Sequence, residues 1–235
     1  KGGKIYLRIK SFGDYVGGWQ TAQDFGSTLD GDYGFAYLTG TLLEDSGFVP
    51  SKIEIENYTP NYLLPYYLSM QESAYEVQSN DIVFDGDTSQ TYSVLFYAFD
   101  YVNDREKLVE RTTYTSQESA YYGYAQSVYT VMNDSTRAYM DQIIAENGFD
   151  KNDPDVIGKV ASYVQSAAEY SMKYDRTLDS QPDVAVAFLR DYKQGVCRHY
   201  ATAATMLYRA LGLPARYTIG YAADAKAGKW TEVTG

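Results

Sequence analysis

The order of apolar and polar residues changes about 103 residues into the chain. Before this point, apolar and polar side chains alternate in three short segments, as they do in strands with one buried face. Stretches rich in Gly and Asp, such as residues 31–34 and 85–87, are typical of the turns that join strands. This pattern predicts a β-rich domain over residues 1–103, built as a small sandwich or barrel. The three alternating segments are residues 4–10, 52–56 and 91–97.

From residue 104 onward, apolar residues recur with the helical period. A helix is expected to begin at Ser116 and to run toward Met132, and another is expected to begin at Asp183. Residues 104–150 fit an inserted helical hairpin over an active-site cleft. The second part of the chain is therefore expected to be mainly helical.

A proline marks one further helix. Pro154 follows Asp153, which is the arrangement of a first-turn proline behind an N-cap, and this predicts a helix that runs to about Tyr170. Its apolar residues recur at three- and four-residue steps, so they form one buried stripe rather than a cofactor site. The stripe consists of Val156, Val160, Tyr163, Val164 and Ala167.

The residues after Gly195 predict a helix followed by a strand. Apolar residues step by four, three and four along the helix, which ends at Gly212 as a C-cap with Pro214 just beyond it. Residues 215–221 then predict a strand. The stepping residues are Tyr200, Ala204, Leu207 and Leu211.

The charge and composition of the chain narrow its range of partners. It carries 20 Lys and Arg against 31 Asp and Glu, a net charge of −11. Because nucleic acids and anionic membrane surfaces bind clustered positive charge, this balance argues against both. The longest apolar run, residues 93–99, is far shorter than the roughly 20 residues that span a bilayer. The chain begins at Lys1 without a signal peptide, so it is expected to be a piece of a longer protein whose membrane anchor lies outside it.

Tyrosine is unusually frequent, at 26 of the 235 residues. These rings are expected to lie half-buried between core and surface, because a tyrosine is apolar along its ring and polar at its tip. A platform for carbohydrate or peptide is the alternative interpretation.

Cys197 is the only cysteine, and it lies in the first turn of the predicted helix. Free backbone N–H groups and the positive end of the helix dipole favour a thiolate there and can also hold the oxygen of a tetrahedral intermediate. Gly195 allows the backbone to turn sharply close to a substrate acyl group, and it forms the supporting loop together with Val196. The pattern equally fits a small buried cysteine at a helix start.

His199 is the only histidine and therefore the only imidazole available as a base. It follows Cys197 by two residues, which is about 200° of helix rotation, so its ring is expected to point away from the sulfur. The sequence thus predicts a hydrogen-bonded surface or interface histidine. One Cys and one His also cannot assemble a tetrahedral metal site, so no metal or other cofactor is expected.

The segment from residue 195 to 221 resembles the core of bacterial transglutaminase-like proteins. It reads Gly-x-Cys-x-x-Tyr-Ala, continues through the helix that ends in residues 209–216, and closes a strand at Gly220 and Tyr221. The likeness covers about residues 155–235. The strand at residues 6–8, together with residues 12–19, is also similar, more weakly, to the β-domain that precedes this core in membrane-anchored, envelope-facing members.

The resemblance implies a papain-like Cys-His-Asp mechanism. Cys197 corresponds to the nucleophile that attacks a glutamine amide or a peptide carbonyl and forms a thioester, which an amine or water resolves. The His and Asp of the family would lie on strands after Tyr221, and the 235 residues stop where the His strand is expected to begin. This piece is therefore expected to be inactive or severely impaired.

Taken together, these observations predict an α+β chain. A β-rich domain over residues 1–103 precedes a helical segment and the front half of a transglutaminase-like domain over residues 104–235. The leading hypothesis is a cysteine acyltransferase or hydrolase at the extracellular face of a bacterial membrane, with protein or peptide substrates, and a protease would share its nucleophile. The alternative is a non-catalytic envelope module that binds cell-wall material or a protein partner.

Overall fold

The computed structural model describes residues 3–15, 18–20, 31–59, 63–69, 75–78, 81–84 and 91–233. The turn predicted at residues 85–87 lies outside these ranges. The chain divides into two compact units, and each unit draws on separate segments of the sequence. The first comprises Lys1–Ser11, Gln23–Tyr122 and Thr218–Gly235, and the second comprises Phe12–Ala22 and Gly123–Tyr217.

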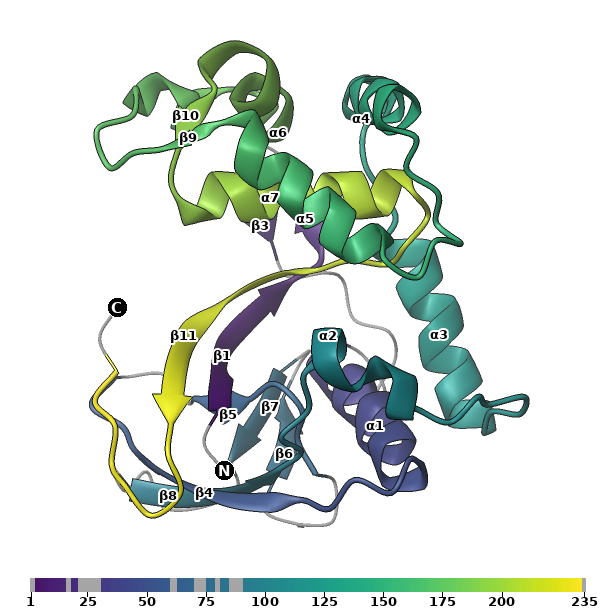
Figure 1. The fold of residues 1–235 in the computed structure, drawn as a ribbon, viewed down its shortest axis with the longest axis vertical. Helices are drawn as coiled ribbons and strands as arrows, with labels where there is room; N and C mark the ends of the chain where they lie inside the picture. The colour runs from purple at the N-terminus through teal and green to yellow at the C-terminus, as the bar shows by residue number, and fades with distance from the viewer. Residues whose placement is uncertain are drawn as a thin grey trace. The chain divides into compact units, whose positions relative to one another are not determined.

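The first unit contains a sheet made from both ends of the chain. Strand β1 (Gly3–Phe12) lies between β11 (Tyr217–Ala225) and β5 (Leu64–Pro65), and β1 and β11 run side by side in Figure 1. Backbone contact is so close that a Cβ on Gly220 would overlap the carbonyl oxygen of Leu7. Only glycine fits at this position of β11.

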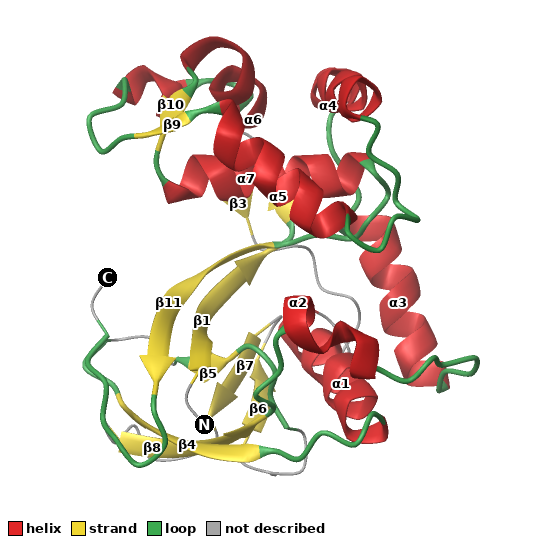
Figure 2. Ribbon diagram, viewed as in Figure 1, coloured by secondary structure: helices red, strands yellow, loops and turns green. Residues whose placement is uncertain are grey.

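The remaining strands of the first unit pair as antiparallel ribbons. Strand β4 (Ser51–Glu56) pairs with β8 (Thr91–Phe96), and β6 (Tyr75–Gln78) pairs with β7 (Asp81–Phe84). The three strands predicted from alternation are thus confirmed. The described strands form small separate sheets, however, and not the single sandwich or barrel that was predicted (Figure 2).

A helix replaces the turn that was predicted at residues 31–34. Helix α1 (Gly31–Asp45) begins there, and Ala36 and Leu43, seven residues apart, are both buried on one face of it. The hydroxyl of Thr39 donates to the Phe35 carbonyl within the helix. Glycines mark turns only where no packing opposes them, and here burial of the apolar face outweighs their helix-breaking tendency.

The core of the first unit joins its sheets to α1. It consists of Leu7, Ala36, Ile55, Leu63, Leu64, Leu68 and Val94. Short helices α2 (Tyr101–Asp104) and η1 (Arg105–Lys107) follow β8, and α3 (Ser116–Val128) then begins where the sequence predicted a helix. Thr115 caps α3, because its hydroxyl accepts from the N–H of Glu118 and its own N–H donates to the Glu118 carboxylate.

The second unit is built around helix α7 (Cys197–Ala210). Helices α4 (Asp134–Asn147), α5 (Val156–Ala167) and α6 (Val184–Ala187) all pack against it (Figure 1). The apolar stripe predicted in α5 faces this core, as do Met140 and Ile143 of α4. Buried side chains of α4 and α7 thus form one core, and among the described residues no helix is both long and apolar enough to cross a membrane.

Two boundaries of α5 differ from the prediction. Asp155, not Asp153, is its N-cap residue, because the Asp153 carboxylate accepts the N–H of Asp155 in the preceding turn. The helix ends at Ala167 because the next residues form strand β9 (Glu169–Tyr170), which pairs in parallel with β10 (Gln194–Gly195). Pairing with a distant segment therefore stops the helix before Tyr170.

The remaining elements of the second unit are short. A hairpin of β2 (Asp14–Tyr15) and β3 (Trp19–Gln20) comes from the N-terminal part of the chain. A 3-10 helix, η2 (Arg176–Ser180), precedes α6, and a π-turn, η3 (Phe188–Tyr192), follows it. The predicted start at Asp183 is confirmed, since its carboxylate caps α6 by accepting from the N–H of Val186.

Candidate functional site

Cys197 is the first residue of α7, and its side chain is exposed. The residue before it, Val196, is the N-cap in an extended conformation. The N–H groups of Cys197 and Arg198 have no acceptor within the described part of the chain, as expected for the first turn of a helix. The predicted placement in the first turn of the helix is confirmed, and the cysteine is not buried.

Position 195 must be glycine because the imidazole of His199 packs against its backbone. A Cβ at this position would lie 2.5 Å from Nδ1 of His199 and 3.0 Å from the ring of Phe188. The space beside Gly195 that was expected to admit a substrate acyl group is filled by the side chains of His199 and Phe188. Gly195 therefore supports the loop by letting a histidine ring pack against the backbone just before Cys197.

His199 is buried, with 1% of its surface exposed, and does not lie on the surface as predicted. Its Nδ1 accepts the N–H of Val196 at 3.0 Å, and its Nε2 is 2.9 Å from Oδ1 of Asp179. Because Nδ1 accepts, the proton must be on Nε2 and be donated to Asp179. Burial, together with the nearby charge of Arg198, lowers the pKa of His199 despite the carboxylate, so the ring is neutral.

Val196 is consequently a supporting residue and not an oxyanion donor. Its N–H is already donated to His199 and is not available to a substrate oxygen. The donors that remain at the start of α7 are the N–H groups of Cys197 and Arg198. The oxyanion role predicted for the first turn of α7 stays a prediction, and these two N–H groups are the donors available for it.

Asp179 joins the imidazole to a cluster of polar side chains. The Tyr174 hydroxyl donates to Oδ2 of Asp179 at 2.8 Å, and Arg198 forms an ion pair with the same carboxylate. Burial raises the pKa of Asp179, but hydrogen bonds from His199 and Tyr174 and the charge of Arg198 outweigh it and lower that pKa overall. The carboxylate is therefore ionised and holds the His199 ring in one tautomer.

Aromatic residues from two distant segments pack near the start of α7. The Trp19 indole N–H donates to Oγ1 of Thr202 at 2.9 Å, and the ring stacks on Tyr217 with centroids 5.2 Å apart. Burial, followed by an electrostatic interaction with Cys197, raises the pKa of Tyr217, so the phenol and the cysteine lie near each other. Residues near Trp19 thus belong with the cysteine helix, although the sequence assigned them to the β-rich domain.

Arg209 lies near the C-terminal end of α7 and is also buried, with 1% of its surface exposed. Its guanidinium donates to the backbone carbonyls of Gly13, Val131 and Ala215 at 2.6–2.9 Å. Burial lowers its pKa to about 10, which still leaves it charged at pH 7. This side chain therefore ties three separate loops to the helix that carries Cys197.

Sequence reasoning found Cys197 and its loop but missed the side chains that hold them. Asp179 lies 20 residues before His199 in a short 3-10 turn, and no periodic pattern marks it. Trp19 lies 183 residues from its partner Thr202. The available signal was the position of His199 three residues after the N-cap, where a side chain can reach back to the cap N–H.

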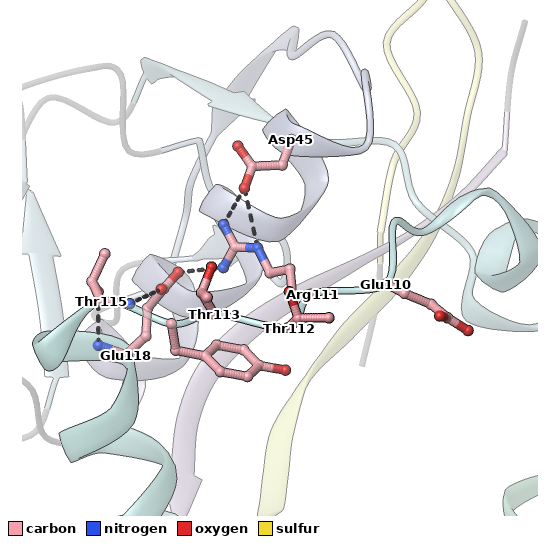
Figure 3. A pocket seen from close by; sticks show the side chains of 8 residues that line it. Asp45, Glu110, Arg111, Thr112, Thr113, Thr115 and Glu118 are labelled. Atoms are coloured by element: carbon pink, nitrogen blue, oxygen red, sulfur yellow. Dashed lines mark hydrogen bonds and ion pairs between the residues drawn. The ribbon is translucent and has the colours of Figure 1, made fainter.

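A pocket of about 420 Å³ lies elsewhere, within the first unit (Figure 3). It is lined by a polar cluster in which the Arg111 guanidinium binds the carboxylates of both Asp45 and Glu118. Because that cation is already paired with two anions, it has little capacity left for an anionic ligand. The described residues also hold no group of His, Cys, Asp and Glu arranged for a metal ion.

Comparison with known proteins places this geometry in a family context. Residues 137–234 match the transglutaminase-like superfamily. No curated protein sequence matches the chain. The fold is similar to two crystal structures of the periplasmic domain of TgpA from Pseudomonas aeruginosa. One is bound to ethylmercury and has a TM-score of 0.55, 14% identity, and coverage of 92% of this chain and 70% of that chain. The other has a TM-score of 0.56, 15% identity, and coverage of 92% and 68%.

Proposed function

Because residues 137–234 form a transglutaminase-like superfamily domain, we propose that Cys197 is the nucleophile of an acyltransferase or hydrolase that acts on glutamine amides or peptide bonds. The observation that carries this proposal is the exposed thiol at the first position of α7, inside the matched region. The dipole and free N–H groups of a helix N-terminus stabilise a thiolate, which is the reactive form of cysteine.

The chemistry follows from this placement. The sulfur attacks the carbonyl carbon, and the N–H groups of Cys197 and Arg198, which have no acceptor among the described residues, stabilise the resulting oxyanion. The C–N bond then breaks, the nitrogen leaves with a proton, and a thioester remains. An amine that attacks the thioester forms a new amide, water forms a carboxylate, and either one releases the thiolate.

The proton transfers in this reaction need a base other than His199. That ring is the only imidazole in the 235 residues, and both of its nitrogens are hydrogen-bonded. We therefore expect the 235 residues by themselves to be acylated at Cys197 but to turn over slowly, because a thiol without its base loses most of its catalytic advantage. The paired base and its carboxylate are expected to lie outside these residues.

The proposed location is the extracellular face of a bacterial membrane, with proteins or peptides as substrates. Its support is the likeness in fold to a periplasmic domain, over 92% of this chain. In this setting the membrane contact is expected to come from segments outside the 235 residues, and neither a metal nor another cofactor takes part in the proposed chemistry.

A second candidate function is a non-catalytic envelope module. The observation in its favour is a set of exposed aromatic side chains on the first unit, since exposed rings are suited to stacking on sugars or peptides. Retention of the chain on purified cell-wall material, lost when these residues are changed to serine, would support it. The set consists of Tyr6, Tyr58, Tyr101, Tyr114, Tyr122 and Trp230.

The nucleophile can be tested with an activated ester, which acylates a thiolate without help from a base. The 235-residue chain is mixed with p-nitrophenyl acetate, and we expect a burst of about one nitrophenolate per chain, with one acetyl group on Cys197. The Cys197→Ala variant should give no burst, and the urea-unfolded chain should react at the rate of a free thiol. Equal rates for the folded and unfolded chains would refute activation by the fold. Added imidazole should then speed turnover, and an amine should trap the acyl group.

A further inference from the structure

We propose that His199 is a positioning residue for Cys197, an inference that rests on the proposed function. His199 is the third residue of α7, and its Nδ1 accepts the N–H of the N-cap residue Val196 at 3.0 Å. In helix capping boxes a Glu or Gln at this third position makes the same bond to the N-cap N–H. Here a neutral imidazole fills that role, two residues after the proposed nucleophile.

This bond fixes the chain immediately before the sulfur. Gly195 pairs with Tyr170 across the parallel strands, and the N–H of Ser171 donates to the Gly195 carbonyl at 2.8 Å. Val196 is held by its hydrogen bond to His199, so both residues that precede Cys197 have a fixed backbone direction. The thiol is therefore held at the helix start, where the N–H groups of Cys197 and Arg198 have no acceptor among the described residues.

The surroundings of the ring keep Nδ1 free to accept. The Asp179 carboxylate accepts the hydrogen bond from Nε2–H, which keeps the proton on Nε2 and excludes the opposite tautomer. The ring is also clamped between Phe188, stacked at 5.7 Å, and Tyr174, edge-on at 4.8 Å. The charged groups that face it are Asp179, Arg198 and Arg176. A ring enclosed in this way is an orienting group, because neither nitrogen is open to a substrate.

The test uses the single thiol of the chain. The rate of Cys197 alkylation by iodoacetamide at pH 7 is measured by mass spectrometry, and exchange of the Val196 amide hydrogen is followed by NMR. His199→Leu removes the acceptor at similar volume, whereas His199→Gln restores it in the form of a capping box. Val164→Ala, a buried change in α5, controls for general loss of stability.

We expect His199→Leu to slow alkylation about tenfold and to speed exchange of the Val196 amide by at least as much, the population change expected when one such hydrogen bond is lost. The Gln variant should stay within about threefold of wild type in both measurements, as should Val164→Ala. The inference is overturned if the Leu variant also stays within threefold, or if Gln is as slow as Leu, because either result reduces His199 to a packing residue.

Gly195→Ala breaks the same contact from the other side and keeps the inference falsifiable if the Leu variant does not fold. Its Cβ would displace Nδ1 of His199 from Val196, so slow alkylation is expected again, and a wild-type rate would overturn the inference. The two proposals also fail separately. If wild type gives no ester burst but His199→Leu is still alkylated more slowly than wild type and His199→Gln, only the proposed function is refuted. A normal burst with equal alkylation rates removes the positioning role alone.

Discussion

Replacing Arg209 with lysine should destabilise the second unit. The guanidinium makes four hydrogen bonds to three backbone carbonyls, and it is enclosed to 1% exposure. A lysine keeps the charge but has one nitrogen, which reaches one of the three carbonyls. At least two charge-assisted bonds are lost.

The magnitude follows from those bonds. Hydrogen bonds to a charged group contribute about 1.5–3 kcal/mol each, and breaking a buried charged network costs about 3–5 kcal/mol. We therefore expect Arg209→Lys to lower the free energy of unfolding by about 3–5 kcal/mol. The loosened segments contain Gly13, Val131 and Ala215, and Gly13 lies next to the hairpin that carries Trp19, so this hairpin should lose its packing as well.

Urea denaturation followed by near-UV circular dichroism measures this loss. Trp19 reports directly, because the Arg209 guanidinium lies 5.3 Å from its ring. Arg190→Lys is the matched control: that guanidinium is exposed and pairs with the adjacent Asp191, so its midpoint should not move. An Arg209→Lys midpoint equivalent to a loss of less than about 1 kcal/mol would refute the reasoning, since water would then satisfy the carbonyls equally well.

Three further predictions concern stability. The pKa of His199 in the folded chain lies below its ordinary value of 6.5, so as pH falls the unfolded chain binds a proton at this residue before the folded chain does. The free energy of unfolding of wild type should therefore decrease as pH drops through 6.5. Urea titrations at pH 7 and pH 5 should show a smaller decrease for His199→Gln. Burial raises the pKa of Glu118, but hydrogen bonds from the Thr115 N–H and from Arg111 outweigh it and lower that pKa to about 2. Glu118→Gln should therefore cost about 2 kcal/mol at pH 7, and the difference should vanish as pH falls from 4.5 to 2. Gly220→Ala should cost about 2 kcal/mol or more by overlap with the Leu7 carbonyl, read from the thermal midpoint, and an unchanged midpoint would contradict that contact.

Local patterns predicted local structure well. Alternation located β1, β4 and β8, and the helical period located the buried face of α5, because each of these depends on which side of one element meets a core. The same logic placed Cys197 at a helix start. Helix α1 was missed because Gly31 and Gly34, two of its three glycines, are typical of turns, and burial of Ala36 and Leu43 offsets this tendency.

Contacts between distant segments lay beyond this kind of reasoning. The side chain of Arg209 reads as an exposed charge at the end of a helix, yet its three carbonyl partners come from loops up to 196 residues away in sequence. His199 was judged by its direction relative to Cys197 alone. Its true partners, the N–H of Val196 and the carboxylate of Asp179, are satisfied only when the 3-10 turn and the strand β10 come together. Burial of a polar side chain depends on such partners, and partners are set by tertiary structure.

A neutral histidine suits the third position of α7 better than the acidic residue usual in capping boxes. A glutamate there would hold the Val196 N–H equally well, but it would place a negative charge within one turn of a thiolate and oppose its formation. The imidazole supplies the acceptor without a negative charge. The negative charge that orients the ring is on Asp179, which binds the opposite side of the ring at Nε2 and forms an ion pair with Arg198. His199 thus holds the loop and also leaves the positive end of the helix dipole unopposed. A carboxylate at the same position would hold the loop but oppose that positive end. The same bonds that fit His199 for the first task deprive it of a free nitrogen for proton transfer.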